Sequence, residues 1–150
     1  MPVSEAERDR RQTLLHQHIA AENKGDLPAI MATFAPDAVM QYNGVQFPTP
    51  QAIGAAHAYL GFADVAGAFD RPRNSIDRLS FTDTDIVLEG RLNGKHVRDF
   101  LGFAGTGKSV ELPFISFYCF GADGLITSER VVMNLGPLHP QFIPAPGGLG

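Results

Sequence analysis

The first sixty residues place apolar side chains at the spacing typical of amphipathic helices. Ser4 and Glu7 form an S-x-x-E capping box, so a helix is expected to begin near Glu5 and to stop at Gly25. Its buried stripe would consist of four apolar residues: Leu14, Leu15, Ile19 and Ala20. The chain is therefore expected to open with one long helix that covers another layer.

Two shorter helices are expected to follow. Asp26 can cap the first, with Pro28 in its first turn. Its buried face would be Ile30, Met31 and Phe34. The segment AVMQYN, residues 38–43, is typical of a short strand. Thr49 then stands before a proline, which predicts a third helix that runs to about Phe62.

Beyond residue 73 the pattern changes to the alternation typical of strands. The segments are NSIDRLSF, DIVLEGRL, HVRDFLGF, VELPFISFYCF and LITSERVVMN, with turns expected at 82–84, Asn93-Gly94, 105–107 and 121–124. Helices that precede mostly antiparallel strands predict an α+β fold, with the helices on one face of a curved sheet. We expect a single domain over residues 1–136 and a Pro/Gly-rich tail over residues 137–150.

The charge balance argues against a nucleic-acid partner. The chain has 12 Lys and Arg against 16 Asp and Glu, a net charge of −4, and its basic residues are scattered. No apolar run approaches the length of a membrane span, so no membrane partner is expected. The single Cys119 and the charged amino terminus predict a reduced, cytoplasmic location.

Residues 102–109, GFAGTGKS, match the G-x-x-x-x-G-K-S pattern of a phosphate-binding loop. Such a loop needs a helix after it, whose amino terminus shares the phosphate charge. Here Ser109 is followed by VELPFISFYCF, which contains Pro113, β-branched residues and four aromatic residues, and is typical of a strand. We therefore expect a connection between two strands and no bound nucleotide.

The same region contains a second pattern, a series of strands separated by T-G and D-G turns. Its members are Gly94, His96, Phe100, Gly102, Thr106, Gly107, Val110, Pro113, Asp123, Gly124, Ile126 and Glu129. With residues 18–39 and 50–60, they resemble SnoaL-like polyketide cyclases and their ester-cyclase relatives in the nuclear-transport-factor-2-like superfamily, which also holds ketosteroid isomerases. The resemblance covers about residues 12–140. It implies a cone-shaped roll of three helices on a curved, mostly antiparallel sheet around an apolar pocket.

Several positions depart from the patterns of these relatives. Val97-Arg98-Asp99 replaces the small residues that usually follow the histidine. Asn134 replaces an acid on the last strand, and Ser116 stands where the cyclases can have an acid that works as general base. Tyr42 occupies the position of the catalytic Asp of the ketosteroid isomerases. Because both familiar carboxylate bases are missing, the resemblance does not choose among cyclisation, isomerisation, epoxide opening, dehydration and plain binding.

The period of two assigns faces to the last strands. Along residues 110–120, Glu111 marks the outer face, so the other face would hold Leu112, Phe114, Ser116 and Tyr118. Along residues 125–134, an inward Ile126 would bring Arg130 and Asn134 inward and leave Glu129 outside.

The candidate catalytic residues are His96, Asp99, Arg130 and Tyr42. His96 would be the general acid and base, because imidazole titrates near neutral pH. Asp99 would orient His96 or pair with Arg130, while Arg130 or Tyr42 would stabilise a developing oxyanion. The candidate substrate-binding residues are Ser116, Tyr118, Asn134, His57 and Phe114.

Structural roles stay open for all of these residues. His96 could close a hairpin, Asp99 could pair with Arg98 at the surface, and Arg130 could face a cross-strand glutamate. The hydroxyl residues could belong to the core, and His57 could lie on a helix surface. His16 and His18 are two residues apart on a helix, so they are expected to face different sides, and neither is predicted to be a ligand.

These expectations favour an enzyme that performs acid–base chemistry on a hydrophobic small molecule without a cofactor or metal. The reaction would be a cyclisation, an isomerisation, or the opening of an epoxide or lactone. The alternative is a non-catalytic module of the same fold for ligand binding or dimerisation. A second subunit is expected on the outer sheet face of Ile115, Phe117 and Cys119, forming a homodimer. Phe142 and Ile143 of the tail could cover the pocket.

Overall fold

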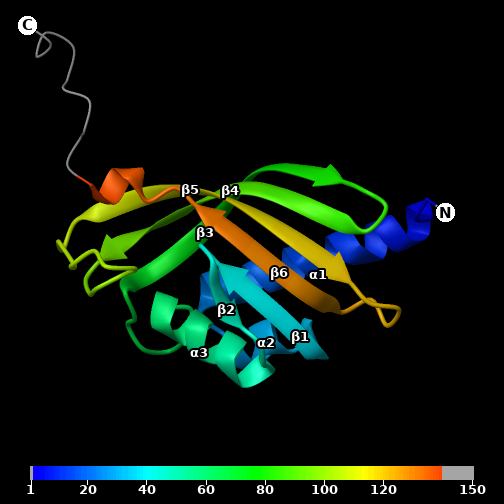
Figure 1. Ribbon diagram of the computed structural model, residues 1–150, viewed down its shortest axis with the longest axis horizontal. Coiled ribbons are helices and arrows are strands. Elements are labelled where there is room, and N and C mark those ends of the chain that lie inside the picture. Colours follow the sequence, from blue (N-terminus) through cyan, green and yellow to red (C-terminus); the bar gives the residue numbers. More distant parts are fainter. Residues whose placement is uncertain (1, 140–150) are drawn as a thin grey trace, which may run out of the picture.

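The computed structural model describes residues 2–139 as three helices and one six-stranded sheet (Figure 1). The elements are α1 (Glu5–Lys24), α2 (Leu27–Met31), β1 (Phe34–Tyr42), β2 (Val45–Phe47), α3 (Pro50–Leu60), β3 (Phe69–Phe81), β4 (Asp85–His96), β5 (Ser109–Phe120) and β6 (Ile126–Met133), followed by a 3-10 turn at Gly136–Leu138. The expected tail lies outside the described residues after position 139, and so do Phe142 and Ile143.

The helix boundaries follow from the expected caps. The Ser4 hydroxyl oxygen accepts a hydrogen bond from the Glu7 N–H at 3.1 Å, and Gly25 ends α1 in the left-handed region at φ 67°. Asp26 and Thr49 accept the corresponding bonds at the starts of α2 and α3. All three predicted helices are therefore confirmed. However, α3 ends two residues earlier than expected, and Phe34, expected on the buried face of the second helix, begins β1 instead.

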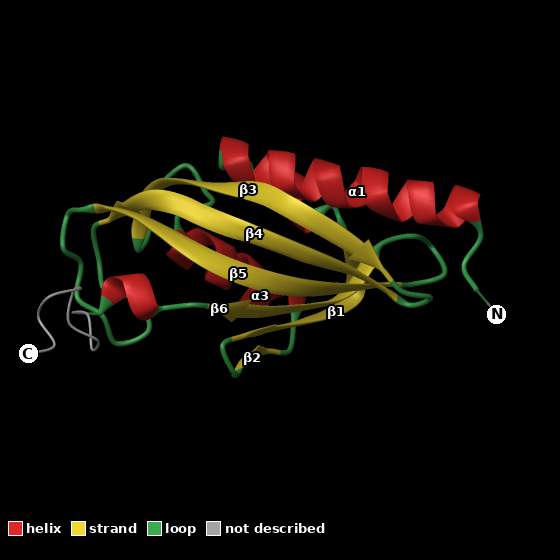
Figure 2. Ribbon diagram, turned by 90° about the horizontal axis from the view of Figure 1, so that it is seen from above, coloured by secondary structure: helices red, strands yellow, loops and turns green. Residues whose placement is uncertain are grey.

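The strand order in the sheet is β2-β1-β6-β5-β4-β3. β1 and β6 run parallel, and the other neighbouring strands pair antiparallel. Figure 2 shows the helices on one side of the curved sheet, with α1 beside β3 and α3 behind the central strands. The α+β class and the roll of three helices on a curved sheet are thus confirmed.

The predicted turn at Asn93-Gly94 is wrong, because β4 continues through it to His96. Asn93 lies opposite Arg73 on β3 and Glu111 on β5, and Gly94 lies opposite Val110 on β5. A Cβ atom at Gly94 would lie 3.2 Å from Pro72 Cα, so the glycine allows a close approach rather than a turn. The segment 97–108, expected to contain most of a strand, is instead the loop between β4 and β5.

The loop over residues 102–109 leads into β5. The helix that a phosphate-binding loop requires is replaced by a strand, as expected. None of the helices described here is long and apolar enough to cross a membrane.

Candidate active site

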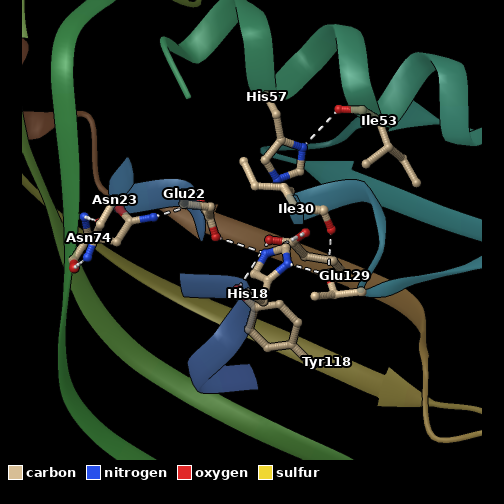
Figure 3. A network of polar contacts seen from close by, with 10 residues as sticks. His18, Glu22, Asn23, Ile30, Ile53, His57, Asn74, Tyr118 and Glu129 are labelled. Carbon is tan, nitrogen blue, oxygen red and sulfur yellow. Dashed lines mark hydrogen bonds and ion pairs between the residues drawn. The ribbon is translucent and has the colours of Figure 1, made fainter. Parts of the chain in front are cut away.

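Helix α1 places two polar side chains inside the protein. His18 and Glu22 lie three and seven residues after Leu15, so they share its buried stripe. The His18 side chain is fully buried, and Glu22 is only 4% exposed. Figure 3 shows both side chains beneath α3, among polar groups from α3 and the sheet.

The hydrogen bonds of His18 define where its ring proton lies. Its Nδ1 is 2.8 Å from Thr33 Oγ1, and the Thr33 hydroxyl donates to the Ile30 carbonyl at 2.6 Å. Thr33 therefore accepts from His18, and Nδ1 bears a proton. His18 Nε2 lies 2.8 Å from Glu22 Oε1. Two lone pairs would repel at this distance, so the contact requires a proton on the imidazole or on the carboxyl group, although neither atom makes a hydrogen bond of regular geometry within residues 2–139.

His57 on α3 completes this side of the site. Its Nδ1 donates to the Ile53 carbonyl at 2.9 Å, because a carbonyl oxygen can only accept. The Nε2 atom of the neutral ring is then left as an acceptor. The His57 ring packs edge-on against His18, with ring centres 5.8 Å apart. The cavity-lining position expected for His57 is thus correct, and the helix-surface alternative is wrong.

The second buried carboxyl group is Glu129 on β6, which is 4% exposed. The Tyr118 hydroxyl donates to its Oε1 at 3.2 Å. Its Oε2 is 3.9 Å from His18 Nε2 and has no hydrogen-bond partner within residues 2–139. Glu129 therefore directs one free carboxyl oxygen toward the His18–Glu22 pair.

The prediction that Glu129 faces outward was wrong because β6 contains a bulge. Phe120 lies opposite Ile126, but Cys119 lies opposite Ser128, so Thr127 is an extra residue. One extra residue moves every later side chain to the other face. For this reason Glu129 is buried together with two residues that follow it at intervals of two, Val131 and Met133.

Burial dominates the electrostatics of these four groups. It raises the pKa of Glu22 to about 7, against the lowering effects of His57 and Asn74. Burial also raises the pKa of Glu129 to about 7, helped by the charge of Glu22 and opposed by His18. The pKa values of His18 and His57 are lowered by burial. Near neutral pH the cluster can therefore hold both a proton donor and a proton acceptor.

The cluster borders a small internal cavity of about 20 Å³. Its polar wall consists of Glu22, Asn74, His57, Ser116, Tyr42, Tyr118 and Glu129. A cavity of roughly 10–15 Å³ is enough for one water molecule when polar partners surround it. Ser116 adds a buried hydroxyl that has no partner in the described part of the chain. The cavity thus has room for one water molecule beside Glu129.

Five of the residues expected at the site line this cavity: Tyr42, His57, Phe114, Ser116 and Tyr118. The other four lie elsewhere. His96 is buried against Phe69, with ring centres 5.4 Å apart, at the far end of β4. Asp99 is exposed, and its backbone carbonyl accepts a bond from the Tyr59 hydroxyl. The proposed grouping around His96 and Asp99 is therefore not formed.

Arg130 and Asn134 point away from the cavity, again because of the bulge in β6. The Arg130 guanidinium lies over the outward Phe117 ring, 4.5 Å from its centre. The Asn134 side chain is exposed and accepts a bond from the Gly136 N–H at 2.8 Å. The cross-strand alternative for Arg130 also fails. Arg130 lies opposite Phe117, and its two expected partners, Glu111 and Glu89, pair with Arg91 and Arg78.

His18, Glu22 and His57 bring their ligand atoms within 4.8 Å of one another, so they form the one grouping in the described residues that could hold a metal ion. The His18–Glu22 contact at 2.8 Å is already explained by one shared proton. We therefore interpret the grouping as a proton-sharing cluster.

The sequence matches the SnoaL-like domain family over residues 15–129. The chain belongs to this family. No functionally curated protein matches it. Solved structures with the same fold include AclR, a putative hydroxylase from Streptomyces galilaeus, with 22% identity, a TM-score of 0.69, and coverage of 85% of this chain and 91% of that one.

Two further structures have the fold of this SnoaL-like protein. A putative SnoaL-like polyketide cyclase from Jannaschia sp. CCS1 has 19% identity and a TM-score of 0.73, and 90% of this chain covers 92% of it. The epoxide hydrolase/cyclase-like enzyme SalBIII, described as having a role in pyran ring formation in the polyether salinomycin, has 15% identity and a TM-score of 0.72. The match covers 87% of this chain and 95% of that one.

Sequence reasoning missed three members of the SnoaL-like site: His18, Glu22 and Glu129. The first two could have been found, because a histidine and a glutamate four residues apart occupy the apolar stripe of Leu15 and Ile19. Glu129 gave no such signal, since the bulge is not visible in the pattern. Tyr42 and Ser116 line the cavity, while its carboxyl groups come from α1 and β6.

Proposed function

We propose that this SnoaL-like protein is an acid–base enzyme that opens a strained or activated ring, an epoxide or a lactone, in a hydrophobic small molecule. The proposal rests mainly on one observation: two carboxyl groups, Glu22 and Glu129, and two imidazoles, His18 and His57, are buried together beside a cavity with room for one water molecule. His18 Nε2 lies 2.8 Å from Glu22 Oε1 and 3.9 Å from Glu129 Oε2. Such groups can donate a proton at one atom and accept one at another.

Glu129 would be the general base. Its free Oε2 takes a proton from the cavity water, and the water oxygen bonds to the electrophilic carbon of the ring. The carbon–oxygen bond of the ring breaks, and the leaving oxygen takes the proton shared by His18 and Glu22. The proton on Glu129 then returns to the pair across the 3.9 Å between Oε2 and His18 Nε2. Water is consumed, and the cluster regains its starting state.

The other side chains of the cavity would orient the substrate. Ser116 and Tyr42 place hydroxyl groups on its wall, and Phe114 contributes an apolar surface. SalBIII, with the same fold, is described as an epoxide hydrolase/cyclase-like enzyme, which supports ring opening as the reaction class. The same cluster could cyclise a substrate whose own hydroxyl group replaces the water as nucleophile.

The test is turnover of a panel of uncharged epoxides and lactones in isotopically labelled water. Wild type is compared with Glu129→Gln and with Glu89→Gln, a matched change of a half-buried glutamate on β4 that lies outside the cluster. We expect Glu129→Gln to lower kcat/KM by roughly 10²–10⁴-fold and Glu89→Gln to have no effect. The oxygen label should appear in the product.

Three outcomes decide the proposal. Equal turnover by Glu129→Gln and wild type would refute the role of the base. If wild type and both variants bind a ligand but none of them turns it over, the non-catalytic binding module is favoured. With an active substrate, kcat/KM should pass through a maximum near pH 7. Glu129 works only when ionised and the His18–Glu22 pair only while it holds its proton, and burial raises the pKa of both carboxyl groups to about 7.

A further inference from the structure

The two imidazoles of the buried cluster are held by hydrogen bonds on one side only. His18 Nδ1 lies 2.8 Å from Thr33 Oγ1, and His57 Nδ1 donates to the Ile53 carbonyl at 2.9 Å. These contacts fix both rings and leave both Nε2 atoms as free acceptors. Figure 3 shows the His57 ring directed from α3 toward His18 and Glu22. A histidine that binds a metal almost always donates its other ring N–H to an oxygen in this way.

The two carboxyl groups have the same one-sided arrangement. Glu22 Oε2 accepts a hydrogen bond from the Asn74 amide at 2.9 Å, and Glu129 Oε1 accepts one from the Tyr118 hydroxyl at 3.2 Å. The other oxygens, Glu22 Oε1 and Glu129 Oε2, are buried and make no hydrogen bond within residues 2–139. Each carboxyl group is therefore oriented by one oxygen and offers the other to the interior of the cluster.

The separations between these free atoms suit one metal ion. His18 Nε2 lies 2.8 Å from Glu22 Oε1 and 3.9 Å from Glu129 Oε2. Ligand atoms of a tetrahedral zinc ion, with bonds of about 2.0–2.1 Å, are about 3.3 Å apart, between these two values. The ligand atoms of His18, Glu22 and His57 lie within 4.8 Å of one another, so the widest separation shortens when a metal binds.

We propose that the cluster binds one divalent transition-metal cation with the chemistry of Zn²⁺. Its ligands are His18, Glu22, His57 and Glu129. Two imidazoles and two carboxylates form a mixed nitrogen and oxygen donor set, which suits zinc, whereas Mg²⁺ prefers oxygen ligands alone. The two carboxylates balance the charge of the dication, and the imidazoles are neutral. The complex has no net charge, which lowers the cost of burying both carboxylates.

The cation and the shared proton exclude each other. The contact between His18 and Glu22 requires a proton in the metal-free protein, and the cation displaces that proton to solvent. The cation also occupies Glu129 Oε2, the proposed base, and four protein ligands leave no open position for water. The metal-bound protein is therefore inactive in the proposed ring opening. Only this consequence rests on the proposed function, and the binding of the metal does not.

Glu22 connects the site to solvent. It lies in the wall of the internal cavity and also in the wall of a cleft of about 570 Å³ at the end of α1. The cleft is lined by charged side chains of both signs, including Asp64, Asp70 and Arg71. Glu22 is therefore the ligand that a cation entering from this cleft meets first.

The test is titration calorimetry with ZnCl₂ and MgCl₂ on the full chain, after dialysis against EDTA and then against metal-free buffer. We expect one Zn²⁺ per chain and no binding of Mg²⁺. Glu22→Gln and His57→Gln each remove one ligand and should weaken Zn²⁺ at least about a hundredfold, the upper end of the loss on mutating an outer hydrogen-bond partner. His16→Gln, the matched change of an exposed histidine on α1, should leave the affinity unchanged.

NMR of the histidine ring nitrogens in wild type locates the metal even where a variant does not fold. Zn²⁺ should shift Nε2 of His18 and His57 and leave the ring of His16 unaffected. Shifts at His16 alone, equal affinities of Glu22→Gln and wild type, or no binding of Zn²⁺ by wild type would overturn the proposal.

The consequence for catalysis is measured separately. With a substrate of the proposed reaction, one equivalent of Zn²⁺ should abolish turnover and EDTA should restore it. Undiminished turnover by the zinc-bound protein would overturn the inhibition. Zinc binding at the cluster by a protein that turns over no epoxide or lactone without metal would refute the proposed function alone.

Discussion

Replacing Glu129 by Gln should make the protein more stable at alkaline pH. Burial raises the pKa of this carboxyl to about 7, from an ordinary value of 4.5. The folded state then holds its proton over a pH range in which the unfolded chain has lost it. The stability from this group is fully present below about pH 4.5 and is lost as pH rises through about 7.

The size of the effect follows from the shift. Each pKa unit of difference between the folded and unfolded states corresponds to about 1.4 kcal/mol. Ionised Glu129 therefore lowers the free energy of unfolding by on the order of 3 kcal/mol above pH 7. Gln keeps the shape, and its carbonyl can still accept from Tyr118. Glu129→Gln should therefore match wild type near pH 4.5. Near pH 8 it should exceed wild type by about 3 kcal/mol, or roughly 6–12 °C in Tm.

The assay is urea unfolding of both proteins at several values between about pH 4.5 and pH 8. The difference between the two free energies of unfolding reports the titration of Glu129 together with its effect on the neighbouring His18 and Glu22. Glu89→Gln alters a carboxylate that is 46% exposed and lies 3.6 Å from Arg78. Its free energy of unfolding should therefore stay within about 0.5 kcal/mol of the wild-type value at every pH. A difference for Glu129→Gln that does not change with pH would refute the assignment of a buried, protonated carboxyl group.

Three further predictions test other parts of the molecule. Ile115 and Val132 are 41% and 56% exposed on the outer sheet face, and we predict a homodimer through this face that Val132→Glu converts to a monomer in light scattering. Gly94→Ala should cost about 1–2 kcal/mol in urea unfolding, because its Cβ would meet Pro72 at 3.2 Å. Magnesium-ATP should bind neither wild type nor Lys108→Ala in calorimetry, because a strand follows the loop.

The fold could be predicted because its signals are local. Caps at Ser4, Asp26 and Thr49 begin the helices, and Gly25 ends the first of them. The inward face of β5 followed from strict alternation around Glu111 and was confirmed. The exception is Asn93-Gly94, a pair that is typical of hairpin turns. Here its glycine is required by a contact with Pro72, which is 22 positions away in the chain and has no local signature.

The site could be predicted only in part, because its members depend on tertiary contacts. Tyr42 and Ser116 came from the resemblance, and both line the cavity. His96 was favoured because histidine suits acid–base chemistry, but β4 carries it beyond the cavity to Phe69. One inserted residue, Thr127, was enough to exchange Arg130 for Glu129. Errors of register thus remove functional residues from a prediction even when the fold is correct.

The burial of four titratable groups in one core is explained by shared protons. An isolated ionised carboxylate would be very costly in this environment, and a paired one less so. His18 is fixed by Thr33 with Nε2 placed 2.8 Å from Glu22 Oε1, a distance at which one proton or an ion pair offsets the burial of the carboxyl group. Glu129 lies near enough to exchange that proton but keeps one oxygen free. The arrangement that makes the cluster tolerable in the core is therefore the one that lets it transfer a proton.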